Sequence, residues 1–164
     1  RFHRYQKRLL LFPCLLFLSF YDKINYITYS KELHMFKKIL ALHTGGTISM
    51  AADDSGAVIT NEVNPMTQVT SPIEGIAVTS EDFFNLPSPQ MTPRQHVSPV
   101  SKIKEEAHNY DGIVITHGTD TLEETAYFLD TMELPEIAVV ITGAMRSSNE
   151  LGSDGVYNFL TAFE

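Results

Sequence analysis

Two threonines and one aspartate occupy positions from which their side chains could carry out nucleophilic chemistry. Thr47 follows two glycines at the end of an apolar run, and Thr119 and Asp120 follow a glycine at the end of another. Glycine lets the backbone turn tightly and approach another molecule closely, so both hydroxyls would be presented from constrained turns. A hydroxyl held in this way can attack an electrophilic carbon and form a covalent intermediate. The residues suggest a small-molecule site with threonine-based chemistry, but they name no substrate.

Ordinary structural roles stay open for the same groups. Asp120 and Glu123 have the spacing of a capping box, in which Asp120 would cap a helix. The same carboxylate could instead hold the ammonium group of a substrate. Thr47 and Thr119 could satisfy backbone groups within their own turns.

Several other kinds of site have no support in the sequence. The Thr-Gly-Gly-Thr turn lacks the ending of a phosphate-binding P-loop and the fingerprint of a dinucleotide site. A Gly-x-Ser-x-Gly elbow is also missing. The six histidines show no ligand spacing, so we predict no metal site. Arg146 could bind an anion or make a structural ion pair.

The predicted elements would bring the glycine turns together. Apolar runs at residues 39–42, 112–116 and 138–142 indicate buried strands. Helices are expected at about 98–109, with Ser98 as N-cap, at about 121–132, and after 153. Such alternation is typical of an α/β fold with a mostly parallel sheet flanked by helices. Ligands of these sheets bind beyond the carboxyl ends of the strands, so we predict a glycine-turn active site there.

Two connecting segments have a composition that bears on this site. Residues 48–56 are small and polar and follow the first turn, so they could form a mobile lid or an ordinary hairpin loop. Residues 86–93 are rich in proline and predict an extended surface loop in which the backbone of Ser88 is fixed by a proline on each side. A short strand is expected near residues 76–78.

The first 34 residues differ in charge and pattern from the rest. They hold six Lys/Arg and two Asp/Glu, so six of the 12 basic and 18 of the 20 acidic residues follow them. The excess of acidic residues in positions 35–164 disfavours a broad phosphate-binding surface, and we predict no nucleic-acid partner. No cysteine occurs after Cys14, which fits a reducing compartment, and we expect a cytoplasmic location.

The apolar run at residues 9–20 follows a basic start and is too short to span a bilayer. It has the proportions of a signal peptide, but the small-residue cleavage site is missing. Three interpretations stay open for residues 1–34: translated upstream sequence outside the working protein, a membrane-targeting segment, or a structural arm.

Two long motifs resemble the signatures of bacterial-type L-asparaginases. They are His43-Thr44-Gly45-Gly46-Thr47-Ile48 and the stretch from Asp111 to Thr121, DGIVITHGTDT. Gly143-Ala144-Met145-Arg146 and Ser153-Asp154-Gly155 resemble the family's next landmark. The resemblance covers residues 35–164, which we expect to be an incomplete N-terminal α/β domain. Residues 1–34 would be a non-homologous extension, and the family's C-terminal domain is absent from the sequence.

The resemblance implies hydrolysis of the side-chain amide of L-asparagine to L-aspartate and ammonia, without a metal or an organic cofactor. Thr47 would be the nucleophile that forms an acyl-enzyme. Thr119 would be the second catalytic threonine, which positions or activates the attacking hydroxyl or water and also binds the substrate, and Asp120 would be catalytic with it. Asp120 would also hold the substrate's α-ammonium, and Ser88 its α-carboxylate. Backbone N–H groups of Gly46 and Thr119 would form the oxyanion hole.

Three departures from the family pattern limit what can be transferred. No tyrosine occurs at residues 55–59, where many members carry one in a lid, and Pro89 replaces a glutamine of some members, which leaves activity on L-glutamine open. The family's catalytic lysine lies further downstream, and the sequence ends at Glu164 without a candidate for it.

The family also implies a homo-oligomer for the full-length protein. A catalytically inert fragment and an asparaginase-like subunit of a tRNA-dependent amidotransferase stay open as alternatives.

Overall fold

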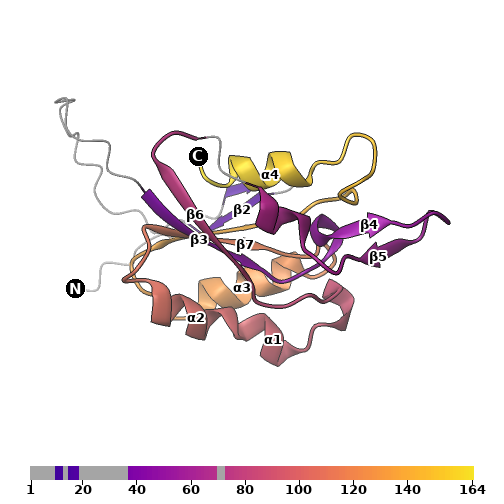
Figure 1. The fold of residues 1–164 in the computed structure, drawn as a ribbon. Coiled ribbons are helices and arrows are strands. Elements are labelled where there is room, and N and C mark those ends of the chain that lie inside the picture. The colour runs from indigo at the N-terminus through magenta and orange to yellow at the C-terminus, as the bar shows by residue number, and fades with distance from the viewer. Residues whose placement is uncertain (1–9, 13–14, 19–36, 70–72) are drawn as a thin grey trace, which may run out of the picture.

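The computed structural model describes residues 10–12, 15–18, 37–69 and 73–164, and within them six strands form one sheet (Figure 1). The spatial order of the strands is β1 (Leu10–Phe12), β2 (Leu15–Leu18), β8 (Ala138–Thr142), β7 (Gly112–Thr116), β3 (Lys37–His43) and β6 (Ile76–Asp82). The pairs β3–β6, β3–β7 and β7–β8 are parallel, whereas β1–β2 and β2–β8 are antiparallel. The predicted mostly parallel sheet is therefore confirmed, and β6 is longer than expected.

Helices cover both faces of the sheet. Figure 1 shows α1 (Pro93–Val97), α2 (Pro99–Glu106) and α3 (Leu122–Thr131) on one face and α4 (Gly155–Thr161) on the other. Three of these helices match the predicted ones, and α1 was not predicted. Ser98 does not cap α2, because it has helical backbone angles between the two helices and its hydroxyl donates to Gln95 O. Thr92 starts the pair of helices instead, and its N–H donates to the Gln95 side chain at 2.8 Å.

The core has two parts because side chains alternate across a strand. Leu40 and Leu42 of β3 point to the side of α2 and α3, and Ala41 between them points to α4, where Phe159 packs. All of these side chains are at most 1% exposed. Each buried Leu contributes roughly 1.5–3 kcal/mol, so β3 is held from both faces and provides a rigid base for the turn after it.

Residues 48–56 take part in a hairpin rather than an unstructured loop. Strands β4 (Met50–Ala52) and β5 (Val58–Thr60) pair antiparallel, and the Asp53 carboxylate closes their turn by accepting from Ser55 and Ala57 N–H. Asn149 holds the hairpin by bonding both the N–H and the carbonyl of Ala52, at 2.7 and 2.8 Å. The segment therefore lies in a hairpin, and its role as a mobile lid stays a prediction.

Part of the N-terminal apolar run lies at the edge of the sheet, where β2 pairs with β8 along residues 139–142. The three interpretations of residues 1–34 stay open. The rest of residues 1–34 lies outside the described residues, so the boundary at residue 34 stays a prediction. None of the helices within the described ranges has the length and apolar character needed to cross a bilayer.

Candidate functional site

The strand order reverses at β3, and the predicted site lies at this reversal. After β3 the chain forms β6 on one side, then crosses to build β7 and β8 on the other. β3 and β7 run parallel and end together, with His43 aligned to Thr116. Loops that leave a sheet at such a switch point diverge and form a crevice. The two threonine-bearing turns both follow strands that end at this switch point.

The backbones of these two turns touch. A Cβ on Gly46 would collide with the Cα of Gly118, and Gly46 also has a left-handed φ of 82°. Only glycine satisfies both conditions without strain. Because Gly46 precedes Thr47 and Gly118 precedes Thr119, this contact brings the two candidate threonines to the same place. Both threonines are partly exposed.

Ser88 joins the same cluster from a third segment. A Cβ on Gly118 would lie 2.5 Å from the Ser88 hydroxyl, which donates to the Asp120 carboxylate at 3.3 Å. Ser88 is 1% exposed and begins a short 3-10 turn, Ser88–Gln90. The expectation of an extended surface loop is therefore wrong at Ser88, because the chain turns inward there. Thr121 holds the turn by donating to Ser88 O at 3.2 Å.

Asp120 faces Ser88 and does not cap a helix. Helix α3 begins at Leu122 after Thr121, and no side chain caps it. The predicted capping box of Asp120 and Glu123 is wrong, because the Asp120 carboxylate accepts from Ser88 instead. Asp120 is exposed, so its carboxylate is accessible to a ligand.

The two predicted oxyanion-hole donors differ in their surroundings. The N–H of Gly46 donates to Leu86 O at 3.0 Å. Since a backbone N–H makes one strong hydrogen bond, this N–H is engaged within the protein, and the oxyanion contact near Gly46 stays a prediction. The N–H of Thr119 stays a prediction.

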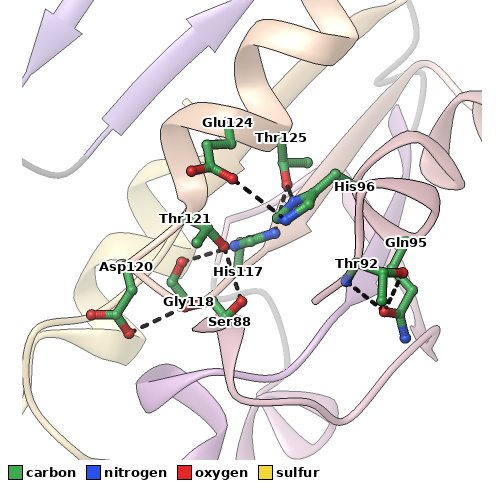
Figure 2. Close-up of polar contacts among 10 residues, drawn as sticks. All are labelled: Ser88, Thr92, Gln95, His96, His117, Gly118, Asp120, Thr121, Glu124 and Thr125. Atoms are coloured by element: carbon green, nitrogen blue, oxygen red, sulfur yellow. Dashed lines mark hydrogen bonds and ion pairs between the residues drawn. The ribbon is translucent and has the colours of Figure 1, made fainter. Parts of the chain in front are cut away.

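A chain of buried polar side chains lies directly behind the second turn (Figure 2). His117 Nδ1 lies 2.8 Å from Gly118 O, and its Nε2 lies 2.8 Å from Thr125 Oγ1. Thr125 Oγ1 is also 2.7 Å from His96 Nδ1, and His96 Nε2 lies 3.7 Å from a Glu124 carboxylate oxygen. Burial lowers the pKa of His117 below its ordinary value, so the ring is neutral near pH 7. These hydrogen-bonded side chains were not predicted from the sequence, since their contacts depend on the packing of α1 against α3.

His43 is a second buried imidazole near the site. It is 0% exposed, its Nδ1 lies 2.9 Å from Thr116 Oγ1, and its ring packs against Phe159 at a centroid distance of 5.6 Å. Among the described residues, its Nε2 has no hydrogen-bond partner. Burial lowers its pKa to about 4, although the charge of Asp82 acts in the opposite direction.

Arg146 and Asp154 stabilise the loop after β8. The Asp154 carboxylate accepts from the N–H groups of Met145 and Arg146, both at 3.0 Å. The Arg146 guanidinium donates to Leu151 O and lies 3.9 Å from Glu150. Of the two interpretations of Arg146, these contacts favour the structural one. Within the described part of the chain, no group of three His, Cys, Asp or Glu side chains is placed to hold a metal ion.

Comparison with known proteins gives one consistent family. The sequence model described as "Asparaginase, N-terminal" matches residues 38–164. A probable L-asparaginase from Deinococcus radiodurans is 40% identical over 125 residues, which cover 76% of this chain and 38% of the relative. A glutamyl-tRNA(Gln) amidotransferase subunit from Methanococcus vannielii is 37% identical over 130 residues, which cover 77% of this chain and 30% of that protein.

A solved structure gives the same result for the fold. The thermostable L-asparaginase from Thermococcus kodakarensis aligns with a TM-score of 0.67 and 37% identity, over 77% of this chain and 39% of that one. The chain therefore spans between 30% and 39% of the length of these three proteins.

Proposed function

The chain belongs to the asparaginase family through its N-terminal domain, and from this premise we propose that it supplies the nucleophile-bearing part of an amidohydrolase acting on L-asparagine. The observation that carries the proposal is the convergence of three segments. The Gly46–Gly118 contact joins the turns of Thr47 and Thr119, and Ser88 lies against Gly118. These contacts support a site in which Thr47 as nucleophile, the Thr119 hydroxyl and the substrate-binding pair Ser88 and Asp120 act together.

Asp120 and Ser88 would bind the charged end of the substrate. The Asp120 carboxylate attracts an α-ammonium, and the Ser88 hydroxyl can donate to an α-carboxylate. The two side chains bond each other at 3.3 Å, a long distance for two oxygens. The hydroxyl can therefore rotate from Asp120 to the substrate at small cost. Binding both charged groups fixes the position of the side-chain amide relative to Thr47.

The reaction would proceed in two steps through a covalent intermediate. In the first, Thr47 Oγ bonds to the amide carbon, its hydroxyl proton passes to the amide nitrogen, and the C–N bond breaks so that this nitrogen leaves as ammonia. In the second, water attacks the resulting aspartyl ester, which releases L-aspartate and restores the Thr47 hydroxyl. Thr119 and Asp120 would position the attacking group. We assign the oxyanion contact to the N–H of Thr119, and a second one to the N–H of Thr47, because that of Gly46 is engaged.

The test uses the protein at the length that its source cells produce. We expect it to release ammonia from L-asparagine, and Thr47→Ala to lower kcat/KM by about 10³-fold or more. Thr47→Ser keeps a hydroxyl and serves as the control, which should retain part of the activity. Mass spectrometry after rapid acid quenching should find an aspartyl group on Thr47. Full activity of Thr47→Ala would refute the role of the nucleophile. The same assay with L-glutamine measures the preference that the sequence leaves open.

The similarity to a component of a glutamyl-tRNA(Gln) amidotransferase supports a second candidate function, in which the ammonia is used by a tRNA-dependent partner enzyme. The two functions differ in their response to tRNA. Ammonia release that rises severalfold on addition of a partner enzyme and tRNA would favour the second function, and an unchanged rate would favour the first. Absence of any release would favour the inert fragment.

Assembly and location belong to the same proposal. The family resemblance supports a homo-oligomer for the full-length protein, which light scattering coupled to gel filtration measures directly. The lack of cysteine after Cys14 supports a cytoplasmic location. Cell fractionation with an antibody against the protein tests this location.

A further inference from the structure

The inference starts from a carbonyl group that fixes the position of a proton. Gly118 O accepts a hydrogen bond from His117 Nδ1 at 2.8 Å. A carbonyl has no proton to give, so His117 Nδ1 must carry the hydrogen. A neutral imidazole has one N–H, and His117 is neutral because burial lowers its pKa. Its Nε2 is therefore an acceptor.

The direction of the next two hydrogen bonds follows from the first. Thr125 Oγ1 lies 2.8 Å from His117 Nε2 and must donate to it. The hydroxyl has only one hydrogen, so toward His96 Nδ1, at 2.7 Å, it can only accept. The hydrogen bonds therefore run one way, from His96 through Thr125 and His117 to Gly118 O. Nδ1 of each imidazole therefore carries a hydrogen.

The end of this chain acts on a peptide group that belongs to the proposed site. Gly118 O and the N–H of Thr119 are parts of one peptide plane, and in a trans peptide they point in opposite directions. No cis peptide bond occurs among the described residues. A hydrogen bond that fixes Gly118 O therefore also fixes the direction of the Thr119 N–H. Glycine at position 118 offers little resistance to rotation of this peptide, so an external bond is needed to hold it.

The surroundings hold this chain of hydrogen bonds rigid. Thr125 and His117 are 0% exposed and His96 is 3% exposed. The His96 ring stacks on His117 at a centroid distance of 6.0 Å and on Phe128 at 6.3 Å. The bonds join three elements, since His96 lies on α1, Thr125 on α3, and His117 follows β7. Buried and fully bonded polar chains of this kind are stiff.

We propose that His96, Thr125 and His117 are positioning residues, whose one-way hydrogen bonds hold the Gly118–Thr119 peptide so that the Thr119 N–H meets the oxyanion of the reacting amide. This inference rests on the proposed amidohydrolase function. None of the three side chains needs to touch the substrate.

The first test locates the hydrogens and needs no enzymatic activity. Neutron diffraction from a perdeuterated crystal of the protein, as its source produces it, should show deuterium on Nδ1 of His96 and His117 and none on His117 Nε2. Deuterium on His117 Nε2 would overturn the inference, even if the protein is an active asparaginase. Conversely, the predicted pattern in a protein that releases no ammonia would refute the proposed function, and the hydrogen-bond chain would stand.

The second test separates positioning from packing. Thr125→Val keeps the shape of the side chain but removes the hydroxyl, and Thr125→Ser keeps the hydroxyl. We expect Thr125→Val to lower kcat about 10- to 100-fold with KM within about twofold, because removing an oxyanion donor outright costs about 10²–10³-fold. Thr125→Ser should stay within about threefold of the natural protein. Equal kcat values for the two variants would overturn the inference.

A matched pair at position 117 provides a check where Thr125→Val does not fold. His117→Asn places an amide N–H near the former Nδ1 and keeps the bond to Gly118 O, whereas His117→Gln places its amide near the former Nε2. The asparagine variant should therefore retain at least about tenfold more kcat than the glutamine variant. The reverse order would overturn the inference.

Discussion

His43 should make the folded protein lose stability as the pH falls from 6.5 to about 4. Its pKa is 6.5 in the unfolded chain and about 4 in the folded protein, since burial of the ring disfavours its charged form. Within this range the unfolded chain holds a proton that the folded chain does not, so acid favours unfolding. The cost is about 1.4 kcal/mol per pH unit, which amounts to about 3 kcal/mol at pH 4. Above pH 6.5 this loss is absent.

Urea unfolding at fixed ionic strength between pH 4 and 7.5 measures the effect in the natural protein and in His43→Asn. Asparagine does not titrate, but its amide can still bond Thr116. We expect the free energy of unfolding to fall by about 3 kcal/mol less in the variant over this range, because the contributions of all other groups cancel in the comparison. If the two proteins lose the same stability, then His43 is not buried in its neutral form and the reasoning is refuted.

Three further predictions concern the site and its loops. Ser88→Ala should raise KM for L-asparagine about 10- to 100-fold with little change in kcat. The variant loses a hydrogen bond to a charged group of the substrate, and that bond is present in the ground state and the transition state alike. In steady-state kinetics, a lower kcat with an unchanged KM would contradict this prediction. Gly118→Ala should lower the free energy of unfolding by about 1–3 kcal/mol in urea titrations, since its Cβ would lie 2.5 Å from the Ser88 hydroxyl. An unchanged midpoint of the urea unfolding transition would disprove the close contact. Asp154→Ala should cost about 1 kcal/mol by the same measurement, because it leaves the N–H of Arg146 to solvent, and Asp154→Asn, which keeps an acceptor oxygen, should cost less.

The central strands were predictable because their side chains are buried on both faces. The run at residues 112–116 has three consecutive aliphatic side chains, Ile113, Val114 and Ile115, and all five of its residues are buried. In contrast, α1 was missed because Pro99 suggests a helix start at Ser98, whereas the chain already turns helical at Pro93. Proline is tolerated in the first turn of a helix. Pro99 therefore marks the start of α2, but it does not exclude another short helix, α1, directly before it.

The positions of the candidate residues in the fold were predictable where they follow from local sequence, and not where they depend on packing. Gly46, Thr47 and Thr119 belong to short turns that can be identified in the sequence. The orientation of Asp120 could not be predicted, because the competing acceptor role toward Ser88 depends on a contact across 32 positions. The bond between His96 and Thr125 spans 29 positions and exists only once α1 packs on α3.

The contact between the two glycine turns also has a consequence for the order of events during folding. Thr44 donates to Thr116 O across 72 positions, and the Gly46–Gly118 contact closes a loop of comparable length. The chain entropy lost in closing so long a loop is recovered only when β3 and β7 pair. The candidate nucleophile and its partners therefore come together late, after local helices have formed. In a refolding experiment, recovery of ligand binding should follow the slow formation of the sheet and lag behind the far-ultraviolet signal of the helices.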